Sequence, residues 1–225
     1  DFVRVETESI SGSESFSVFD YQAPGIFIFA LLMSTIGVAG SLAREIEKGT
    51  LERLKLSRMT AFDFLFGTLL PWSILTVVQV VILFAVAFIL GFTWSGGYIS
   101  LLVAMIIAVI AGIASVSLGL LVAAFADNEN HASNLGTLVA VPLSFIVGAF
   151  FPLPKLPIGK IFGNTFEIYD VLPWTHAAES LRMLLIFGGG ISDTIMELVF
   201  VILLTLLLFF FGVYFFSSTR LQPSE

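Results

Sequence analysis

Both histidines of the chain lie close to carboxylates in the sequence. His176 and Glu179 are three residues apart, so on a helix they share one face and could bind a metal ion. Because no third ligand is evident, we expect a surface hydrogen bond instead, and no metal site is predicted. His131 lies beside Asp127 and Glu129, without the partner group that an enzyme site requires. An enzyme is therefore the weakest of the functions considered.

The sequence also lacks a nucleotide site. No G-x-x-x-x-G-K-[ST] loop occurs, and the phosphates of ATP have no cradle without its backbone N–H groups and Lys. With no Cys, disulfides and thiol chemistry are excluded, and no basic patch indicates nucleic-acid binding. We expect no cofactor in this chain. Any ATP and Mg²⁺ would bind a partner subunit or a region outside this sequence.

A densely charged loop, residues 44–60, separates two long apolar runs. Residues 21–43 and residues 64–126 contain no Asp, Glu, Lys or Arg. The chain is 57% hydrophobic and 12% charged, about half the charged fraction of soluble domains, and about 20 apolar residues suffice to span a bilayer. These features predict an all-α polytopic membrane protein whose charged loop stands in water beside the membrane.

Five transmembrane helices are predicted in this chain. Their boundaries are residues 24–43, 64–92, 98–126, 135–151 and 194–216. Pro24 suits the first turn of the first helix. Residues 60–70 are interpreted as an interfacial helical segment that bends at Pro71 into the second span.

Two polar segments flank this transmembrane region, which covers residues 23–220. Residues 1–22 are acidic and Ser-rich, and we interpret them as the end of an extracellular domain or linker. Residues 152–190 contain four prolines and are expected to form external re-entrant or interfacial helices before the last span. Within that segment, residues 175–187 show helical periodicity, with Ala178, Leu181, Leu184 and Leu185 on one side.

Basic residues predict the orientation in the membrane. The charged loop contains five Lys and Arg residues and the next loop, residues 93–97, contains none, so the charged loop is expected in the cytoplasm. The N-terminus then lies outside the plasma membrane, and residues 221–225 form a cytoplasmic tail. An external start and an odd number of spans predict a sixth helix, preceding this sequence in the full protein.

The charged loop has the features of a short helix. Thr50 can cap it, and Glu52 would lie in its first turn, where the helix dipole favours negative charge. Thr60 and Asp63 resemble a second capping arrangement, which opens the next helix. The loop could be a solvated connector that only sets topology, or a docking element for a cytoplasmic partner.

Three segments resemble the ABC-2 type permeases, the membrane subunits of a class of ABC exporters. Residues 47–54 (EKGTLERL) resemble the E-K-G-T-x-E-x-L signature of that family. Residues 21–25 (YQAPG) resemble the Pro-Gly start of the family's second transmembrane helix. Residues 172–182 (LPWTHAAESLR) resemble the N-P-x-x-x-x-x-E-x-L-R segment before its last helix, which places Trp174, Glu179 and Arg182 in the external segment.

The resemblance implies that the charged loop forms a coupling helix resting on a separate ATP-binding cassette subunit. The residues that would contact this ATPase are Glu45, Glu47, Lys48, Gly49, Thr50, Glu52 and Arg53. A second permease copy or paralogue and membrane lipid are the other implied partners. The family often has Pro after a Ser or Thr beyond this helix, whereas this sequence has Ser57-Arg58, which leaves the end of the coupling helix open.

The resemblance also implies that the first and fourth spans of this chain line a path between two copies. Polar or small residues on these spans are Ser34, Thr35, Thr137, Ser144 and Gly148, although such groups could equally bond to nearby backbone. On the third span Ala111, Ser115, Gly119 and Ala123 recur every four residues, a spacing that lets helices approach closely in lipid. This stripe would pack either within one subunit or at the dimer interface.

The polar groups of the predicted spans bear on the substrate. No charged residue lies deep in a span, and ion-coupled carriers generally need one there. This favours a hydrophobic or amphipathic substrate, such as a lipid or drug, although backbone and hydroxyl oxygens could also bind an ion. The predicted function is a permease subunit of an ATP-driven ABC exporter, without enzymatic activity of its own. A non-transporting membrane anchor or sensor is the alternative, and an intramembrane enzyme is a weaker one.

Overall fold

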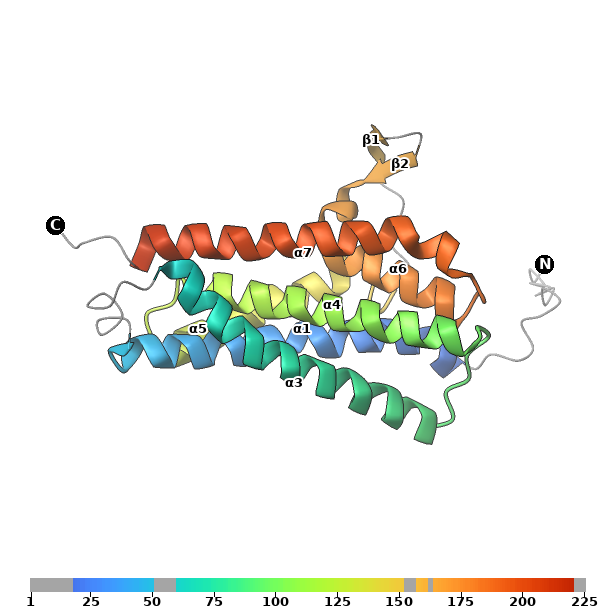
Figure 1. Cartoon of the computed structure of the whole chain (residues 1–225), viewed down its shortest axis with the longest axis horizontal. Helices are drawn as coiled ribbons and strands as arrows, with labels where there is room; N and C mark the ends of the chain where they lie inside the picture. The colour runs from blue at the N-terminus through green and yellow to red at the C-terminus, as the bar shows by residue number, and fades with distance from the viewer. Residues whose placement is uncertain (1–17, 51–59, 152–156, 162–163, 221–225) are drawn as a thin grey trace, which may run out of the picture.

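The computed structural model describes residues 18–50, 60–151, 157–161 and 164–220, and helices dominate it (Figure 1). The helices are α1 (Val18–Glu47), α3 (Ala61–Ile89), α4 (Tyr98–Ala123), α5 (Glu129–Ile146), α6 (Pro173–Leu185) and α7 (Ile191–Arg220), with a short 3₁₀-helix η2 at Ile168–Val171. Two short strands, β1 (Pro157–Ile161) and β2 (Asn164–Glu167), precede η2.

Four of these helices are long and apolar enough to cross a membrane. The membrane candidates are Phe19–Glu47 of α1 and the whole of α3, α4 and α7, with lengths of 26 to 30 residues. This confirms a membrane protein with several apolar helices. The fourth predicted span corresponds to α5, which is 18 residues long and begins with the polar residues Glu129, Asn130 and His131. A fifth crossing therefore stays a prediction.

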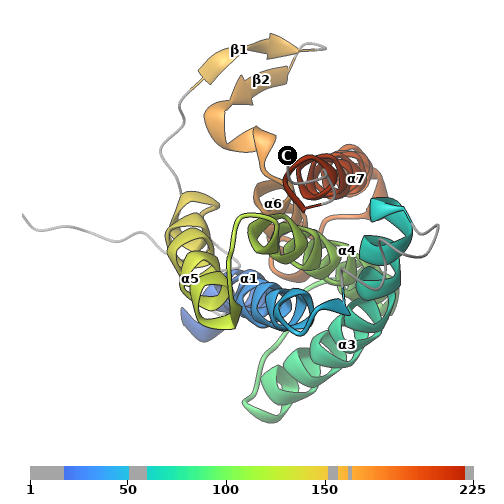
Figure 2. The same ribbon diagram turned by 90° about the vertical axis from the view of Figure 1, so that its left-hand side faces the viewer.

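Two expectations about prolines have different outcomes. Because α1 begins at Val18, Pro24 lies beyond the first turn, and its expected position there is wrong. In contrast, α3 runs unbroken through Pro71 and changes direction in its first half, as both views show (Figures 1 and 2). Pro71 has no N–H to donate to the carbonyl of Gly67, which is the usual cause of such a bend.

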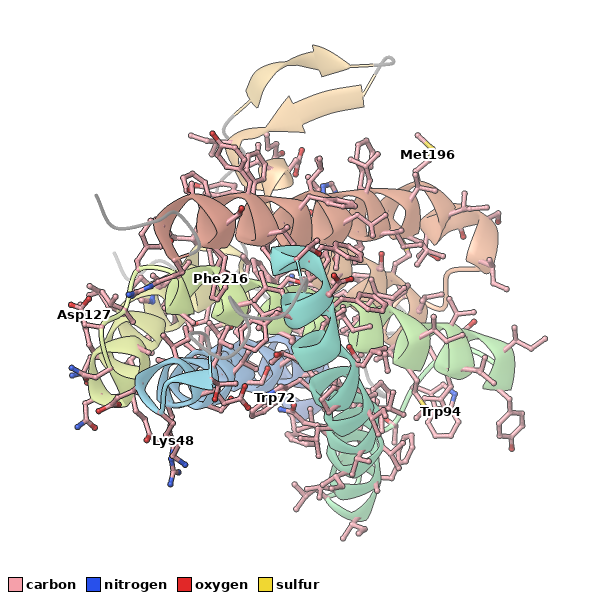
Figure 3. The ribbon with its side chains drawn as sticks, turned by 60° about the vertical axis from the view of Figure 1, so that its left-hand side comes forward. Lys48, Trp72, Trp94, Asp127, Met196 and Phe216 are labelled. Atoms are coloured by element: carbon pink, nitrogen blue, oxygen red, sulfur yellow. The ribbon has the colours of Figure 1, made fainter. Side chains whose placement is uncertain are left out.

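Helices α1 and α4 form the centre of the bundle (Figure 2). Helix α5 packs on α1, α7 packs on α4, and α3 crosses beside both central helices. Helix α6 lies between α4 and α7 and also reaches α1. We call the end where α1 finishes the Lys48 end, and the opposite end, where α1 starts, the Tyr21 end. Figure 3 shows Lys48 and Asp127 at the first and Trp94 and Met196 toward the second.

The core and the outer surface of the bundle are both apolar. Leu31, Leu32 and Ile107 are fully buried between the central helices, whereas α3 and α7 expose large side chains such as Ile74 and Leu203 along their length. A helix that is apolar on all sides suits a lipid environment. The exposed faces of α3 and α7 are thus fitted to acyl chains.

Side-chain hydrogen bonds join the helices near mid-bundle. Thr35 Oγ1 on α1 donates to the carbonyl of Ser115 on α4 at 3.0 Å, and Gln79 Nε2 on α3 donates to the carbonyl of Ala30 at 2.9 Å. Trp174 Nε1 on α6 donates to the carbonyl of Ala111 at 3.0 Å and to Ser115 Oγ at 2.9 Å. Because Ala111 lies in the middle of α4, α6 starts at that depth and runs toward the Tyr21 end (Figure 1).

The hairpin of β1 and β2 departs from the expected all-α fold. The strands are antiparallel, with Lys160 opposite Thr165 and Ile161 opposite Asn164, and they project from the side of the bundle (Figure 1). The helices η2 and α6 lie in this external segment, as expected, and the hairpin is an element that the sequence analysis does not predict. The sequence carries a weak signal for the hairpin, because β-branched and aromatic residues flank Gly163 on both sides.

Candidate functional site

The stripe of small residues on α4 lies inside the bundle. Ala111, Ser115, Gly119 and Ala123 are all buried. A side chain at Gly119 would meet Val38 Cβ at 2.7 Å and the carbonyl oxygen of Thr35 at 2.8 Å. The stripe thus brings α1 and α6 close to α4, through contacts that lie within a single chain.

The five residues of the predicted path do not share one face. Each of their four hydroxyl groups donates to a backbone carbonyl of the chain. Thr35 and Ser144 are buried, whereas Thr137 is exposed on α5. Gly148 lies just after α5, and its carbonyl accepts a hydrogen bond from Arg182. Helices α1 and α5 nevertheless lie side by side, as a shared path would require.

Helix α1 ends where the charged loop begins. The N–H of Lys48 donates to the carbonyl of Arg44 at 3.1 Å and that of Gly49 to Ile46 at 3.0 Å. Gly49 has φ +76°, a left-handed conformation that glycine adopts without strain and that ends helices. The structure therefore shows why a glycine occupies this position in the sequence motif.

The described part of the charged loop presents its charges to the surroundings. Arg44, Glu45, Glu47 and Lys48 are exposed, and Thr50 is half-buried. Glu52 and Arg53 lie outside the described residues, as does most of the expected coupling helix. At the far side of the loop, Thr60 and Asp63 form the predicted capping box, with the N–H of Thr60 donating to Asp63 Oδ2 at 2.9 Å.

Helix α5 contributes to the Lys48 end through the polar residues at its start. Arg44 Nε lies 3.6 Å from Glu129 Oε2, and a groove of about 530 Å³ runs between α1 and α5, lined in part by Lys48 and Ser133. Arg220 at the end of α7 donates to the carbonyls of Ala124 and Ala126. Three of the helices therefore place polar groups around this end.

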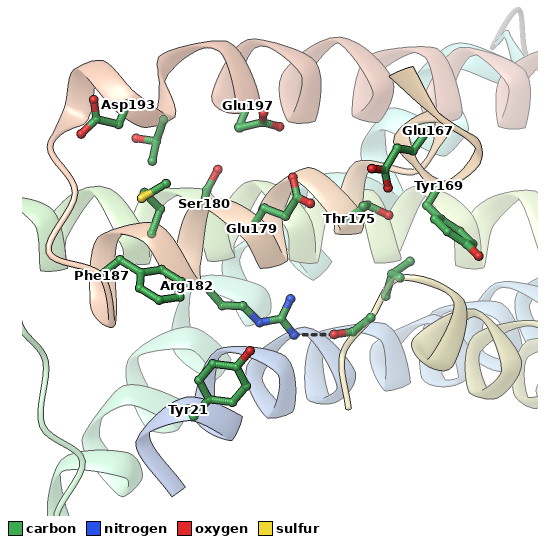
Figure 4. A pocket seen from close by; sticks show the side chains of 14 residues that line it. Tyr21, Glu167, Tyr169, Thr175, Glu179, Ser180, Arg182, Phe187, Asp193 and Glu197 are labelled. Atoms are coloured by element: carbon green, nitrogen blue, oxygen red, sulfur yellow. Dashed lines mark hydrogen bonds between the residues drawn. The ribbon is translucent and has the colours of Figure 1, made fainter. Parts of the chain in front are cut away.

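A second polar site lies at the Tyr21 end. It is a cavity of about 410 Å³ bounded by the start of α1, the residues after α5, η2, α6 and the start of α7 (Figure 4). The lining includes two of the three site residues predicted in the external segment, Glu179 and Arg182. The third, Trp174, is 1% exposed and instead contacts α4.

His176 contacts Glu197 of the cavity lining and has a role that differs from the expected one. Its ring is buried, its Nδ1 bonds the carboxylate of Glu197 and its Nε2 lies 2.8 Å from the carbonyl oxygen of Asp170. Phe200 stacks on the ring, with 5.0 Å between ring centroids. The expected surface hydrogen bond is therefore wrong, because α7 brings Glu197 to the imidazole and covers it.

The His176 pair predicts a pH dependence of stability. Burial alone would lower the pKa of His176, but the bonds to the Glu197 carboxylate and the Asp170 carbonyl outweigh it and raise the pKa above its ordinary 6.5. A raised pKa in the folded state stabilises the fold below pH 6.5, and this contribution is lost as the pH rises through the folded-state value. We expect the melting temperature in detergent to fall across that window. In His176→Gln the fall should be absent, and an unchanged profile in that variant would contradict the assignment.

Three buried polar atoms in the described part of the chain have no hydrogen-bond partner. They are Thr175 Oγ1, Ser180 Oγ and Arg182 Nε, and all three residues line the cavity. Buried polar groups are nearly always satisfied. Glu179 opens onto the same space, and the surrounding protein, together with the charges of Glu197 and Asp170, raises the pKa of its carboxyl.

One functional position of the Tyr21 end is missed by the sequence analysis. Asp20 is 2% exposed and belongs to the first turn of α1 rather than to an external acidic linker. It accepts hydrogen bonds from the N–H of Thr93 at 2.9 Å and from Thr93 Oγ1 at 3.1 Å. This anchors the loop between α3 and α4 to α1. The sequence signal that could have identified it is an acidic residue directly before an apolar run, because negative charge is favoured near a helix N-terminus.

Comparison with known proteins agrees with this architecture. The ABC-2 type transporter family model matches residues 2–186. ABC transporter G family member 20 of Dictyostelium discoideum is 28% identical over 192 residues, or 84% of this chain and 25% of that protein. The daunorubicin resistance ABC transporter permease protein DrrB1 of Streptomyces coeruleorubidus is 26% identical over 165 residues, or 73% of this chain and 56% of that protein.

A third relative is the probable multidrug ABC transporter permease YbhS of Escherichia coli K12, 26% identical over 177 residues, or 76% of this chain and 45% of that protein. The chain thus spans from a quarter to just over half of the length of these relatives. The family match nevertheless covers most of the chain and includes the Pro-Gly segment inside α1, the residues around Gly49 and the start of α6. This chain belongs to the ABC-2 type transporter family.

Proposed function

We propose that this chain is the membrane-spanning permease subunit of an ATP-driven ABC exporter, coupled through residues 44–60 to a separate ATPase subunit. The observation that carries the proposal is the end of α1. There the bundle presents exposed residues of both charges, Arg44, Glu45, Glu47 and Lys48, and Gly49 turns the chain away from the helix. These residues coincide with the motif that resembles the family's coupling segment.

The distribution of charge supports a cytoplasmic Lys48 end. Arg44, Lys48 and Arg220 gather there, and the charged loop contains three further basic residues. Arg182 is the basic residue at the Tyr21 end among those whose side chains are described. By the positive-inside rule the Tyr21 end faces outward. The Pro-rich segment before α7 and the N-terminus of the sequence then lie outside.

Helices α5 and α6 support a five-span arrangement with a re-entrant segment. At 1.5 Å per residue, α5 is about 27 Å long, close to the ~30 Å hydrocarbon core. Helix α6 starts beside Ala111 in the middle of α4 and ends at the Tyr21 end. A helix that covers only the outer half of a membrane is what a re-entrant element requires.

The substrate that we propose is hydrophobic or amphipathic. The described parts of the apolar helices carry charge near their ends, and polar groups near mid-bundle, such as Gln79 and Thr35, are uncharged. Such helices suit a path for lipids or drugs better than an ion relay. Two relatives have names that refer to drugs, which supports the same class. A second copy or a paralogue would complete the path along α1 and α5.

The decisive test is ATP-dependent export by the full-length permease and its ATPase in proteoliposomes. We expect Lys48→Glu to lower substrate-stimulated ATP turnover and export together, by about tenfold, because reversing one charge at a close interface typically costs more than 1 kcal/mol. The control is Lys160→Glu, the same reversal in β1, which should leave turnover unchanged.

Other outcomes would separate the hypotheses. Unchanged export in Lys48→Glu would contradict a coupling role for this segment. ATP hydrolysis by a stable complex that moves no lipid or drug would instead support the alternative of a membrane anchor or sensor.

A further inference from the structure

We propose that the cavity at the Tyr21 end binds an organic ammonium group together with a neighbouring hydrogen-bond acceptor of the same molecule. A primary amine on an alkyl chain with an adjacent hydroxyl or phosphate oxygen has this chemistry. The inference goes beyond the proposed transport function, because binding at this cavity requires neither ATP nor the partner subunit.

The unpartnered atoms show that the cavity is prepared for polar contacts. Thr175 is 5% exposed and Ser180 is 1% exposed, yet the hydroxyl of each lacks a partner among the described residues. Figure 4 shows both side chains at the cavity, on the same helix as Glu179. Leaving a buried hydroxyl unsatisfied costs about 1–3 kcal/mol. A ligand that bonds to both would remove this penalty.

The charge around the cavity selects a cation. Four carboxylates line it, from Glu167, Glu179, Asp193 and Glu197, against the single guanidinium of Arg182. Three of these carboxylates are already engaged. Glu197 holds His176, Asp193 accepts from the N–H of Gly190 at 2.9 Å, and Glu167 takes part in the capping box of η2.

Glu179 is the carboxylate that remains for a ligand. Its side chain has no hydrogen bond or ion pair to the described residues, and Figure 4 shows it between Thr175 and Arg182 at the cavity. Its burial, and then the negative charges around it, oppose its ionisation and raise its pKa. A bound cation would reverse this effect. An ammonium group can also donate up to three hydrogen bonds at once, to Glu179 and to the two free hydroxyls.

Two features favour an organic ammonium over a metal ion. Aromatic rings of Tyr21, Tyr169 and Phe187 line the cavity, and such rings attract alkylammonium groups through their π faces. Arg182 brings a fixed positive charge, and its Nε is a buried donor without a partner. A bare metal ion cannot accept a hydrogen bond from Nε, whereas a ligand with an oxygen beside its ammonium group can. The volume of about 410 Å³ falls in the range of small-molecule sites.

Binding of a fluorescent amine tests this proposal. The probe is dansylcadaverine, which has the free primary ammonium but no oxygen beside it and so tests the ammonium contact alone, and its match is the N-acetylated form, which is neutral. Fluorescence anisotropy is measured with the full-length permease in phosphatidylcholine nanodiscs without ATP. We expect the amine to bind at least about tenfold more tightly than the acetylated probe, since a charge-assisted hydrogen bond would be lost.

Variants assign the binding to this cavity. Glu179→Gln keeps the shape and removes the charge, and should weaken amine binding by about tenfold without affecting the acetylated probe. Thr175→Val, which replaces a hydroxyl by a methyl group, should weaken it by less. The matched control is Asp127→Asn, which removes an exposed carboxylate at the Lys48 end. This variant should bind the amine probe normally. Melting curves confirm that each variant is folded.

Several results would overturn the proposal. Equal affinity for the two probes, or normal binding by folded Glu179→Gln, would each refute an ammonium site. Displacement of the probe by micromolar Mg²⁺ or Ca²⁺, but not by millimolar ethanolamine, would show a metal site instead. Ethanolamine should displace it. If phosphatidylethanolamine in the nanodisc also displaces the probe, the ammonium group comes from a lipid headgroup, and if it does not, from a soluble amine. Failure of export would leave these binding results unchanged, so the two proposals fail separately.

Discussion

Replacing Gly25 by Ala should prevent stable folding of the bundle. Gly25 lies on the buried side of α1, and a Cβ atom there would overlap the carbonyl oxygen of Ala149 and contact its Cα at 3.2 Å. The obstructing atoms are backbone, so no side-chain rotation can relieve the overlap. Overpacking typically costs about 1–3 kcal/mol, and we expect this variant to lie at or above the top of that range. Melting of the purified protein in detergent, followed by size-exclusion chromatography, measures the loss.

Gly67→Ala provides a matched control for this prediction. Gly67 lies on α3, where an added methyl group would have nothing within 4 Å, so the same substitution adds no overlap. We expect a melting temperature equal to or slightly above that of the parent, because Ala favours a helix over Gly by up to about 1 kcal/mol. If the two variants had the same melting temperature, the close approach of α1 to the residues after α5 would be incorrect.

Removing the Trp174 side chain should have the second large effect. Trp174 is 1% exposed and fills the space between α6 and α4, where its Nε1 bonds the carbonyl of Ala111 and Ser115 Oγ. Trp174→Ala should therefore destabilise the protein by about 3–5 kcal/mol, through the cavity that it leaves. Reversible unfolding by denaturant in mixed micelles measures the free energy of unfolding.

A second substitution separates packing from hydrogen bonding. Trp174→Phe keeps most of the ring and removes the N–H donor, so we expect a loss of about 1 kcal/mol beyond the change in volume. Trp94→Ala is the control for the loss of a Trp in general. Trp94 is half-buried at the Tyr21 end, and its removal should cost clearly less than that of Trp174. Equal costs would show that α6 is not anchored by Trp174.

Local patterns in the sequence predicted much of the helical framework. The charge-free runs of residues 21–43 and 64–126 contain most of α1, α3 and α4, because a helix in lipid cannot expose charge. The capping box of Thr60 and Asp63 follows from their spacing alone. Likewise Ala178, Leu181, Leu184 and Leu185 are buried on one side of α6 as their periodicity indicated. These signals depend on neighbours within a few residues.

The polar architecture of the Tyr21 end depends on contacts between distant segments. His176 and Glu197 are 21 residues apart, and Asp20 and Thr93 are 73 residues apart, so no local pattern pairs them. In the sequence Asp20 is one of several acidic residues in the predicted linker. Its burial becomes evident only in the structure, where the loop between α3 and α4 packs against it. The sequence alone does not show that the free hydroxyls of Thr175 and Ser180 line a cavity, because η2 and α7, which enclose it, come from other parts of the chain. The contacts of Glu52 and Arg53 with an ATPase stay a prediction.

The continuity of α1 has a mechanical consequence. The helix extends unbroken for 30 residues, about 45 Å at 1.5 Å per residue, with Tyr21 at the cavity and Lys48 beyond its other end. It is held near its middle, where Thr35 bonds the carbonyl of Ser115, and Ser115 Oγ in turn accepts from Trp174. A single continuous helix therefore joins the charged end of the bundle to the cavity at its opposite end, with no break between them at which the chain could bend freely.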